Sequence, residues 1–133
     1  MGNPVNLFKV RVESSRANNL TFQEIVEMVK YQIEFDVFSE TDKSMAEEIC
    51  LIIAEIYKLP GDIEIQINKT KMTVALVREI YFRLTFEHIM QVIENLKKVT
   101  YEIKSMKSYL RTALYKVVFE MESVTLNQFN VLS

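Results

Sequence analysis

Residues 77–117 read VREIYFRLTFEHIMQVIENLKKVTYEIKSMKSYLRTALYKV and carry the strongest structural signal in this chain. Three segments with apolar residues at helical spacing follow one another here, and polar residues mark the joins. We expect one helix from about Thr73 through Leu84, a second capped by Thr85, and a third over roughly residues 101–121. The first of these is expected to face inward through Leu76, Val77, Ile80 and Leu84.

Two more helices are predicted upstream. The hydroxyl of Thr21 can cap a helix, and Glu24 three residues later completes a capping box. Residues 39–42 are interpreted as a loop, after which Ser44 can cap the next helix. That helix should end at Pro60-Gly61, since neither residue extends a helix.

One strand stands out between the helices. Ile63, Ile65 and Ile67 alternate with polar residues, as in a half-buried strand. A lone strand needs a partner, and the only good candidate in the sequence is residues 8–12. The predicted fold class is therefore mostly α: a compact bundle of about five helices with at most a small two-stranded β element.

The same pattern suggests where the domain begins and ends. Residues 1–20 read as a linker remnant or a short strand, residues 21–121 as a helical interaction domain, and residues 122–133 as a loosely ordered tail. A chain of 133 residues with 49% apolar residues and only two Gly and two Pro fits one helical domain.

Composition also indicates a compartment. No apolar run is long enough to span a membrane, and the N-terminus lacks the pattern of a secretory signal. Cys50 is the only cysteine and lies in a helical pattern, where a buried, unreactive thiol is expected. We therefore expect a cytoplasmic protein with no membrane contact.

Charge is distributed unevenly along the chain. Residues 1–59 carry a net charge of −4 and residues 60–133 a net charge of +2. A basic strip is predicted on and just before the last helix, where it would contact phosphates or an acidic partner. We define the basic strip as Lys97, Lys98, Lys104, Lys107, Arg111 and Tyr115. An ordinary solvated helix face explains the same pattern equally well.

Catalytic chemistry has little support in the sequence. His88 is the only histidine, and its position three residues after Thr85 favours a local hydrogen bond. Glu34 and Asp36 are two residues apart and would lie on different faces of a helix. Phosphate-loop, nucleophile-elbow, dinucleotide and paired-cysteine motifs are missing. We expect a non-enzymatic protein with no catalytic residues, no metal site and no cofactor.

Several of these segments, taken in order, carry a family resemblance. They are QIEFD at residues 32–36, the strand at 63–67, the helix at 77–84, Glu87-His88-Ile89, and Tyr109-Leu110 with Ala113-Leu114-Tyr115. Their order and spacing resemble the C-terminal helical domain, a domain of unknown function, of replication initiator proteins (replisome organizers) on Gram-positive plasmids and related mobile elements.

The resemblance implies an interaction module that recruits host replication proteins, primase or helicase-loading factors. The choice of the basic strip as its contact surface rests on charge geometry alone. Two other functions also fit the residues. A single-stranded DNA-binding module would use the same cations. A structural oligomerisation domain would instead make the chain a homo-oligomer.

Overall fold

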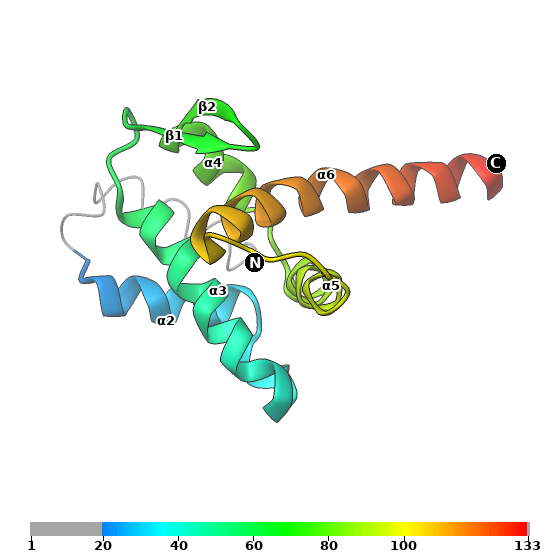
Figure 1. Cartoon of the computed structure of the whole chain (residues 1–133), viewed down its shortest axis with the longest axis horizontal. Coiled ribbons are helices and arrows are strands. Elements are labelled where there is room, and N and C mark those ends of the chain that lie inside the picture. Colours follow the sequence, from blue (N-terminus) through cyan, green and yellow to red (C-terminus); the bar gives the residue numbers. More distant parts are fainter. Residues whose placement is uncertain (1–19, 133) are drawn as a thin grey trace, which may run out of the picture.

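The computed structural model describes residues 20–132, and it describes side chains as far as Glu122. Within that range the fold is mostly α with one two-stranded antiparallel sheet, as predicted (Figure 1). Most of the segment expected as a linker remnant or short strand lies outside the described residues. The elements are α2 (Phe22–Gln32), the 3-10 turn η1 (Phe35–Val37), α3 (Glu40–Lys58), β1 (Glu64–Ile67), β2 (Thr70–Thr73), α4 (Val74–Tyr81), α5 (Phe86–Lys97) and α6 (Met106–Leu132).

The predicted capping box opens α2. Thr21 Oγ1 accepts the backbone N–H of Glu24 at 3.1 Å, and Glu24 Oε1 accepts the backbone N–H of Thr21 at 3.0 Å. Two of the donors that a helix N-terminus leaves unpaired are satisfied in this way. The helix then buries Ile25, Val26 and Val29.

The start of α3 corrects the sequence prediction. Residues 39–42 are not a loop, because Ser39 caps α3 and its hydroxyl accepts the N–H of Asp42 at 3.3 Å. Ser44, the predicted cap, lies inside the helix. Ser39 is followed by Glu40 and Asp42 in the first turn, where acidic side chains favour the helix dipole. The end of the helix at Lys58, just before Pro60-Gly61, is as predicted.

The sheet contains a strand pairing that the sequence analysis did not predict. β1 pairs with β2, with Ile65 opposite Met72. The predicted partner, residues 8–12, lies outside the described residues. Asn68 and Lys69 join the two strands, and both have positive φ (52° and 67°). Two left-handed residues form the tight turn whose twist matches that of a hairpin. A local partner is therefore available without any long connection.

Helix α4 follows β2 without a loop. Thr73 ends the strand and caps the helix, since its hydroxyl accepts the N–H of Leu76 at 3.3 Å. Val77 and Ile80 are buried as predicted, but Leu76 is 47% exposed. Leu76 precedes Val77 by one residue, which corresponds to a rotation of about 100° around the helix axis, so its side chain lies off the buried face.

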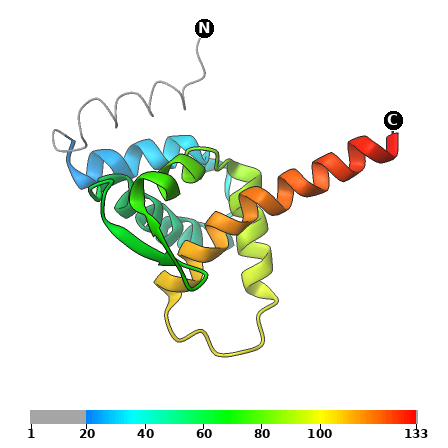
Figure 2. The same ribbon diagram turned by 90° about the horizontal axis from the view of Figure 1, so that it is seen from above.

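The last helix differs from its prediction at both ends. It begins at Met106 and not near Tyr101, because Ser105 Oγ accepts the N–H of Ser108 at 3.2 Å and caps it. Its backbone continues to Leu132. Figures 1 and 2 show α6 crossing α5 and then running well beyond the other elements. In the part of the chain that the structure describes, no helix is both long and apolar enough to cross a membrane.

Helix α3 forms the centre of the core and packs against α2, α4, α5 and α6. Cys50 is fully buried, and burial raises the pKa of its thiol to about 12. Two polar side chains are buried among the described residues, and one of them, Gln32, is 7% exposed. Its amide nitrogen donates to the carbonyl oxygens of Tyr81 (2.9 Å) and Leu84 (3.0 Å), which ties the end of α4 to α2.

Candidate functional site

The structure distributes the basic strip over three segments. Lys97 ends α5 and Lys98 is the residue after it, while Lys104 lies in the connection to α6. Only Lys107, Arg111 and Tyr115 are on α6 itself. The strip is therefore not one face of one helix.

Glu55 of α3 forms ion pairs with two of these cations. Its carboxylate contacts Lys107 Nζ at 3.1 Å and also pairs with the guanidinium of Arg111. The side chain of Arg111 is only 16% exposed. Most of this guanidinium is thus packed against the domain and is not presented to a partner.

Lys97 is also paired within the chain. Its ammonium lies 3.1 Å from Asp42 of α3 and 3.1 Å from Glu94 of α5. The hydrogen bond to Asp42 is the main cause of the raised pKa of Lys97. Lys98 and Lys104 are exposed, and among the described residues neither has an acidic partner.

Tyr115 presents only part of its side chain to a partner. Its side chain is half-buried against the core. The ring also packs on Phe119, with centroids 5.2 Å apart. Of the six residues of the basic strip, Lys98 and Lys104 retain both exposure and free charge.

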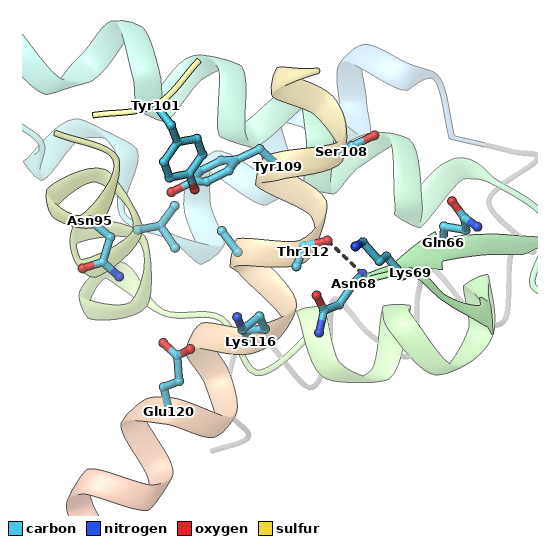
Figure 3. Close-up of a pocket in the computed structure, with 12 residues that line it drawn as sticks. Gln66, Asn68, Lys69, Asn95, Tyr101, Ser108, Tyr109, Thr112, Lys116 and Glu120 are labelled. Carbon is cyan, nitrogen blue, oxygen red and sulfur yellow. Dashed lines mark hydrogen bonds between the residues drawn. The ribbon is translucent and has the colours of Figure 1, made fainter. Parts of the chain in front are cut away.

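A groove that sequence reasoning missed lies beside the strip, between the β hairpin and α6 (Figure 3). It has a volume of about 510 Å³, a size typical of ligand and peptide pockets. We call it the hairpin groove. Its lining comes from the hairpin (Gln66, Asn68, Lys69), α5 (Val92, Asn95), Tyr101, and α6 (Ser108, Tyr109, Thr112, Ala113, Lys116, Glu120).

One hydrogen bond fixes the two walls of this groove. The backbone N–H of Asn68, in the hairpin turn, donates to Thr112 Oγ1 at 3.1 Å. The dashed line in Figure 3 marks this contact. The turn residues and α6 are far apart in sequence, so their spacing gave no signal for the groove. Tyr101 and Tyr109 could be picked out only as aromatic residues near element edges.

Aromatic and charged side chains line opposite ends of the hairpin groove. Tyr101 is 65% exposed, and Figure 3 shows it next to Tyr109. Tyr109 is half-buried, and this burial raises the pKa of its phenol. Lys69 and Lys116 are exposed, with Glu120 at the far end. The groove therefore combines an aromatic end with a small excess of positive charge.

His88 makes the local hydrogen bond that the sequence predicts. Its Nδ1 accepts the backbone N–H of Thr85 at 2.9 Å, so the imidazole closes the N-terminus of α5. Partial burial lowers the pKa of His88, and the neutral ring is the form that can accept this bond. Within residues 20–132, no group of three or more His, Cys, Asp or Glu is placed to hold a metal ion.

Comparison with known proteins places the chain in a family. A search of curated proteins and a search of solved structures each gave no significant match. A family model described as a family of unknown function matches residues 11–131, nearly the whole chain. That description gives no activity and no link to plasmid replication. The chain belongs to the family of unknown function DUF6017.

Proposed function

We propose that this chain is a non-enzymatic interaction module that binds a partner protein in the hairpin groove. The observation that carries the proposal is the exposed Tyr101 at one end of a preformed groove whose lining also includes Asn68 and Asn95. Aromatic anchors surrounded by polar groups are typical of protein-binding surfaces. The bond between Asn68 and Thr112 supports a groove that exists before the partner arrives, which lowers the cost of binding.

The ion pairs of the basic strip favour a protein over a nucleic acid as the binding partner. Phosphate binding depends on free cations, and each internal pair removes one. Glu55 forms ion pairs with Lys107 and Arg111, and Asp42 and Glu94 both form ion pairs with Lys97. The remaining free charge is modest on a chain whose net charge is −2.

The resemblance to plasmid and mobile-element replication initiators supplies the cellular context of the proposal. Two residues of its motifs, Tyr109 and Ala113 in the first half of α6, line the hairpin groove. In this role the module recruits a host replication protein, such as primase or a helicase-loading factor. Recruitment acts by tethering, which raises the local concentration of the partner without bond chemistry.

Binding of the full chain to purified host primase and to a purified helicase loader tests the proposal. We expect a double variant, Tyr101→Ala with Lys116→Glu, to raise the Kd by about tenfold or more because both ends of the groove are altered. The matched control, Leu51→Ala with Lys71→Glu, removes one exposed apolar side chain and reverses one exposed lysine outside the groove. Equal affinities of the two variants would contradict binding of the partner in the hairpin groove. Tighter binding of oligothymidine than of either protein would instead support a strand-binding module.

Self-association is a second candidate, and the length of α6 favours it. The helix runs beyond the other elements in Figures 1 and 2. The ion pair between Arg83 and Glu122 is the last contact that joins its described side chains to the body. A projecting helix is a common dimerisation element. Sedimentation of the full chain over a range of concentrations would show a dimer if this candidate is correct, and a constant monomer mass would exclude it.

A further inference from the structure

A second hollow lies at the other end of the domain, between the end of α2, η1 and the start of α5. It has a volume of about 670 Å³. The exposed apolar side chains Tyr31 and Val37 line it, together with the acidic side chains Glu27, Glu34, Asp36 and Glu87. We call it the acidic hollow.

Exposure sets the residues of the acidic hollow apart from the rest of the surface. Tyr31 is 72% exposed and Val37 is 63% exposed. Together with Tyr101, they are the three most exposed large hydrophobic side chains among the described residues. Tyr101 belongs to the hairpin groove, so all three line one of two concave sites. Exposed apolar side chains gathered in a hollow are characteristic of interaction sites.

The backbone beneath Val37 holds it in place. The N–H of Val37 donates to the carbonyl of Glu34 at 2.9 Å, and the N–H of Phe38 donates to that of Phe35 at 3.2 Å. Phe38 is buried, and its ring packs on Phe86 with centroids 4.6 Å apart. Glu34 turns the chain with a φ of 56°, a conformation that costs energy for a residue other than glycine. Val37 is thus exposed on an ordered turn, which is a preorganised contact.

The negative charge of the acidic hollow favours a basic partner. Lys30 is the only cation in its lining; it pairs with Glu47 at 2.9 Å, outside the hollow, and lies 4.0 Å from Glu27 within it. Glu34 and Asp36 have no basic partner among the described residues. A nucleic acid or an anionic membrane would be repelled by this surface. A basic segment would be attracted to it.

We propose that the acidic hollow binds a short basic peptide segment of a partner protein, with an apolar side chain of that segment seated on Tyr31 and Val37 and its lysines or arginines facing Glu34 and Asp36. This surface is separate from the hairpin groove and opposite to it in charge. The module therefore has two docking surfaces that accept different segments. Its second surface does not depend on the replication role proposed above.

Fluorescence anisotropy with the full chain tests this inference. The probe is a labelled peptide of about ten residues in which four lysines flank a central Leu-Ile pair. One control peptide carries glutamates in place of the lysines, and a second carries serines in place of Leu-Ile. We expect the lysine probe to bind about tenfold tighter than either control, and to weaken as salt rises from about 50 to 200 mM.

Variants locate the binding site. Tyr31→Ser, and separately Glu34→Gln with Asp36→Asn, should each weaken the lysine probe about fivefold to tenfold. The matched controls, Tyr101→Ser and Glu48→Gln with Glu102→Gln, should leave its Kd within about twofold. The inference is wrong if the parent does not prefer the lysine probe, or if the control variants weaken binding as much as the hollow variants. If Tyr101→Ser were the only variant to lose binding of the lysine probe, the peptide would lie in the hairpin groove, and the inference would again be wrong.

Discussion

The hydroxyl of Tyr57 donates a 2.8 Å hydrogen bond to the side-chain oxygen of Gln32, deep in the core between α3 and α2. Both residues are buried. Because the amide nitrogen of Gln32 bonds the end of α4, this contact orients a junction of three helices. Burial raises the pKa of Tyr57, so its hydroxyl stays a donor over the accessible pH range.

Removing this hydroxyl should lower stability measurably. In Tyr57→Phe, the oxygen of Gln32 loses its partner in the buried core, and an unpaired buried acceptor costs about 1–3 kcal/mol. We expect the free energy of unfolding in urea to fall by that amount. Tyr31→Phe is the matched control, since Tyr31 is 72% exposed, and it should leave stability unchanged. Equal stability of the two variants would show that the Tyr57 bond contributes nothing.

Capping signals could be predicted from the sequence because they are local. Thr21 and Glu24 are three residues apart, and that spacing alone specifies a capping box. Ser39 was missed although it follows the same rule. Ser44, with Glu47 three residues later, fits the full capping-box pattern, whereas the residue three after Ser39 is Asp42. Where two candidate caps lie only five residues apart, packing of the helix decides between them.

Contacts between distant segments could not be predicted. Glu55 pairs with Lys107 and Arg111 across 52 and 56 residues, and no periodicity joins these positions. Charge counting therefore overstated the free positive charge of the basic strip. The hairpin groove was missed for the same reason, since its walls come from a turn and a helix more than 40 residues apart. Only the fold brings them together.

The hairpin turn offers a stabilising substitution. Lys69 has a φ of 67°, a left-handed conformation that costs an L-residue about 1 kcal/mol and glycine almost nothing. Lys69→Gly creates the Asn-Gly pair preferred in this turn. The unfolded state also gains entropy, which offsets part of the benefit.

We expect Lys69→Gly to raise the free energy of unfolding by about 0.5 kcal/mol. Lys71→Gly, two residues later in β2, is the control and should lower it by about 0.5–1 kcal/mol. Thermal unfolding of the three proteins measures both effects. A loss of stability in Lys69→Gly would mean that the lysine side chain contributes contacts that outweigh its backbone cost.

His88 should make stability depend on pH. Its folded-state pKa lies below the ordinary value of 6.5, so the unfolded chain binds the proton more readily than the folded chain. Stability is then fully present above about pH 6.5 and falls as the pH drops through the folded-state pKa. Protonation also removes the acceptor for the Thr85 N–H.

His88→Gln separates this effect from the titration of carboxylates. Glutamine at this position of a capping box can accept the same N–H and does not titrate. We expect the parent to lose more stability than His88→Gln between about pH 7 and 5.5, measured by urea unfolding at each pH. Parallel loss in the two proteins would show that His88 contributes nothing to the pH dependence.

Glu55 should restrain nucleic-acid binding by the basic strip. Glu55→Gln removes the charge that neutralises Lys107 and Arg111 while keeping the size of the side chain. Two freed cations should tighten binding to an oligothymidine of about 20 nucleotides by about threefold to tenfold at low salt, with a steeper salt dependence. The variant should also lose about 1–2 kcal/mol of stability, because Arg111 is mostly buried and keeps its charge.

The control for this experiment is Glu48→Gln, which changes the net charge equally on the same helix without touching the basic strip. It should gain less DNA affinity than Glu55→Gln at low salt and should match the parent at about 0.15 M salt, where long-range charge effects are weak. If both variants gained the same DNA affinity, the change in net charge would explain the effect of Glu55→Gln. No gain in Glu55→Gln would mean that Lys107 and Arg111 do not reach phosphate even when released, and the strip would then serve only to hold α6 on α3.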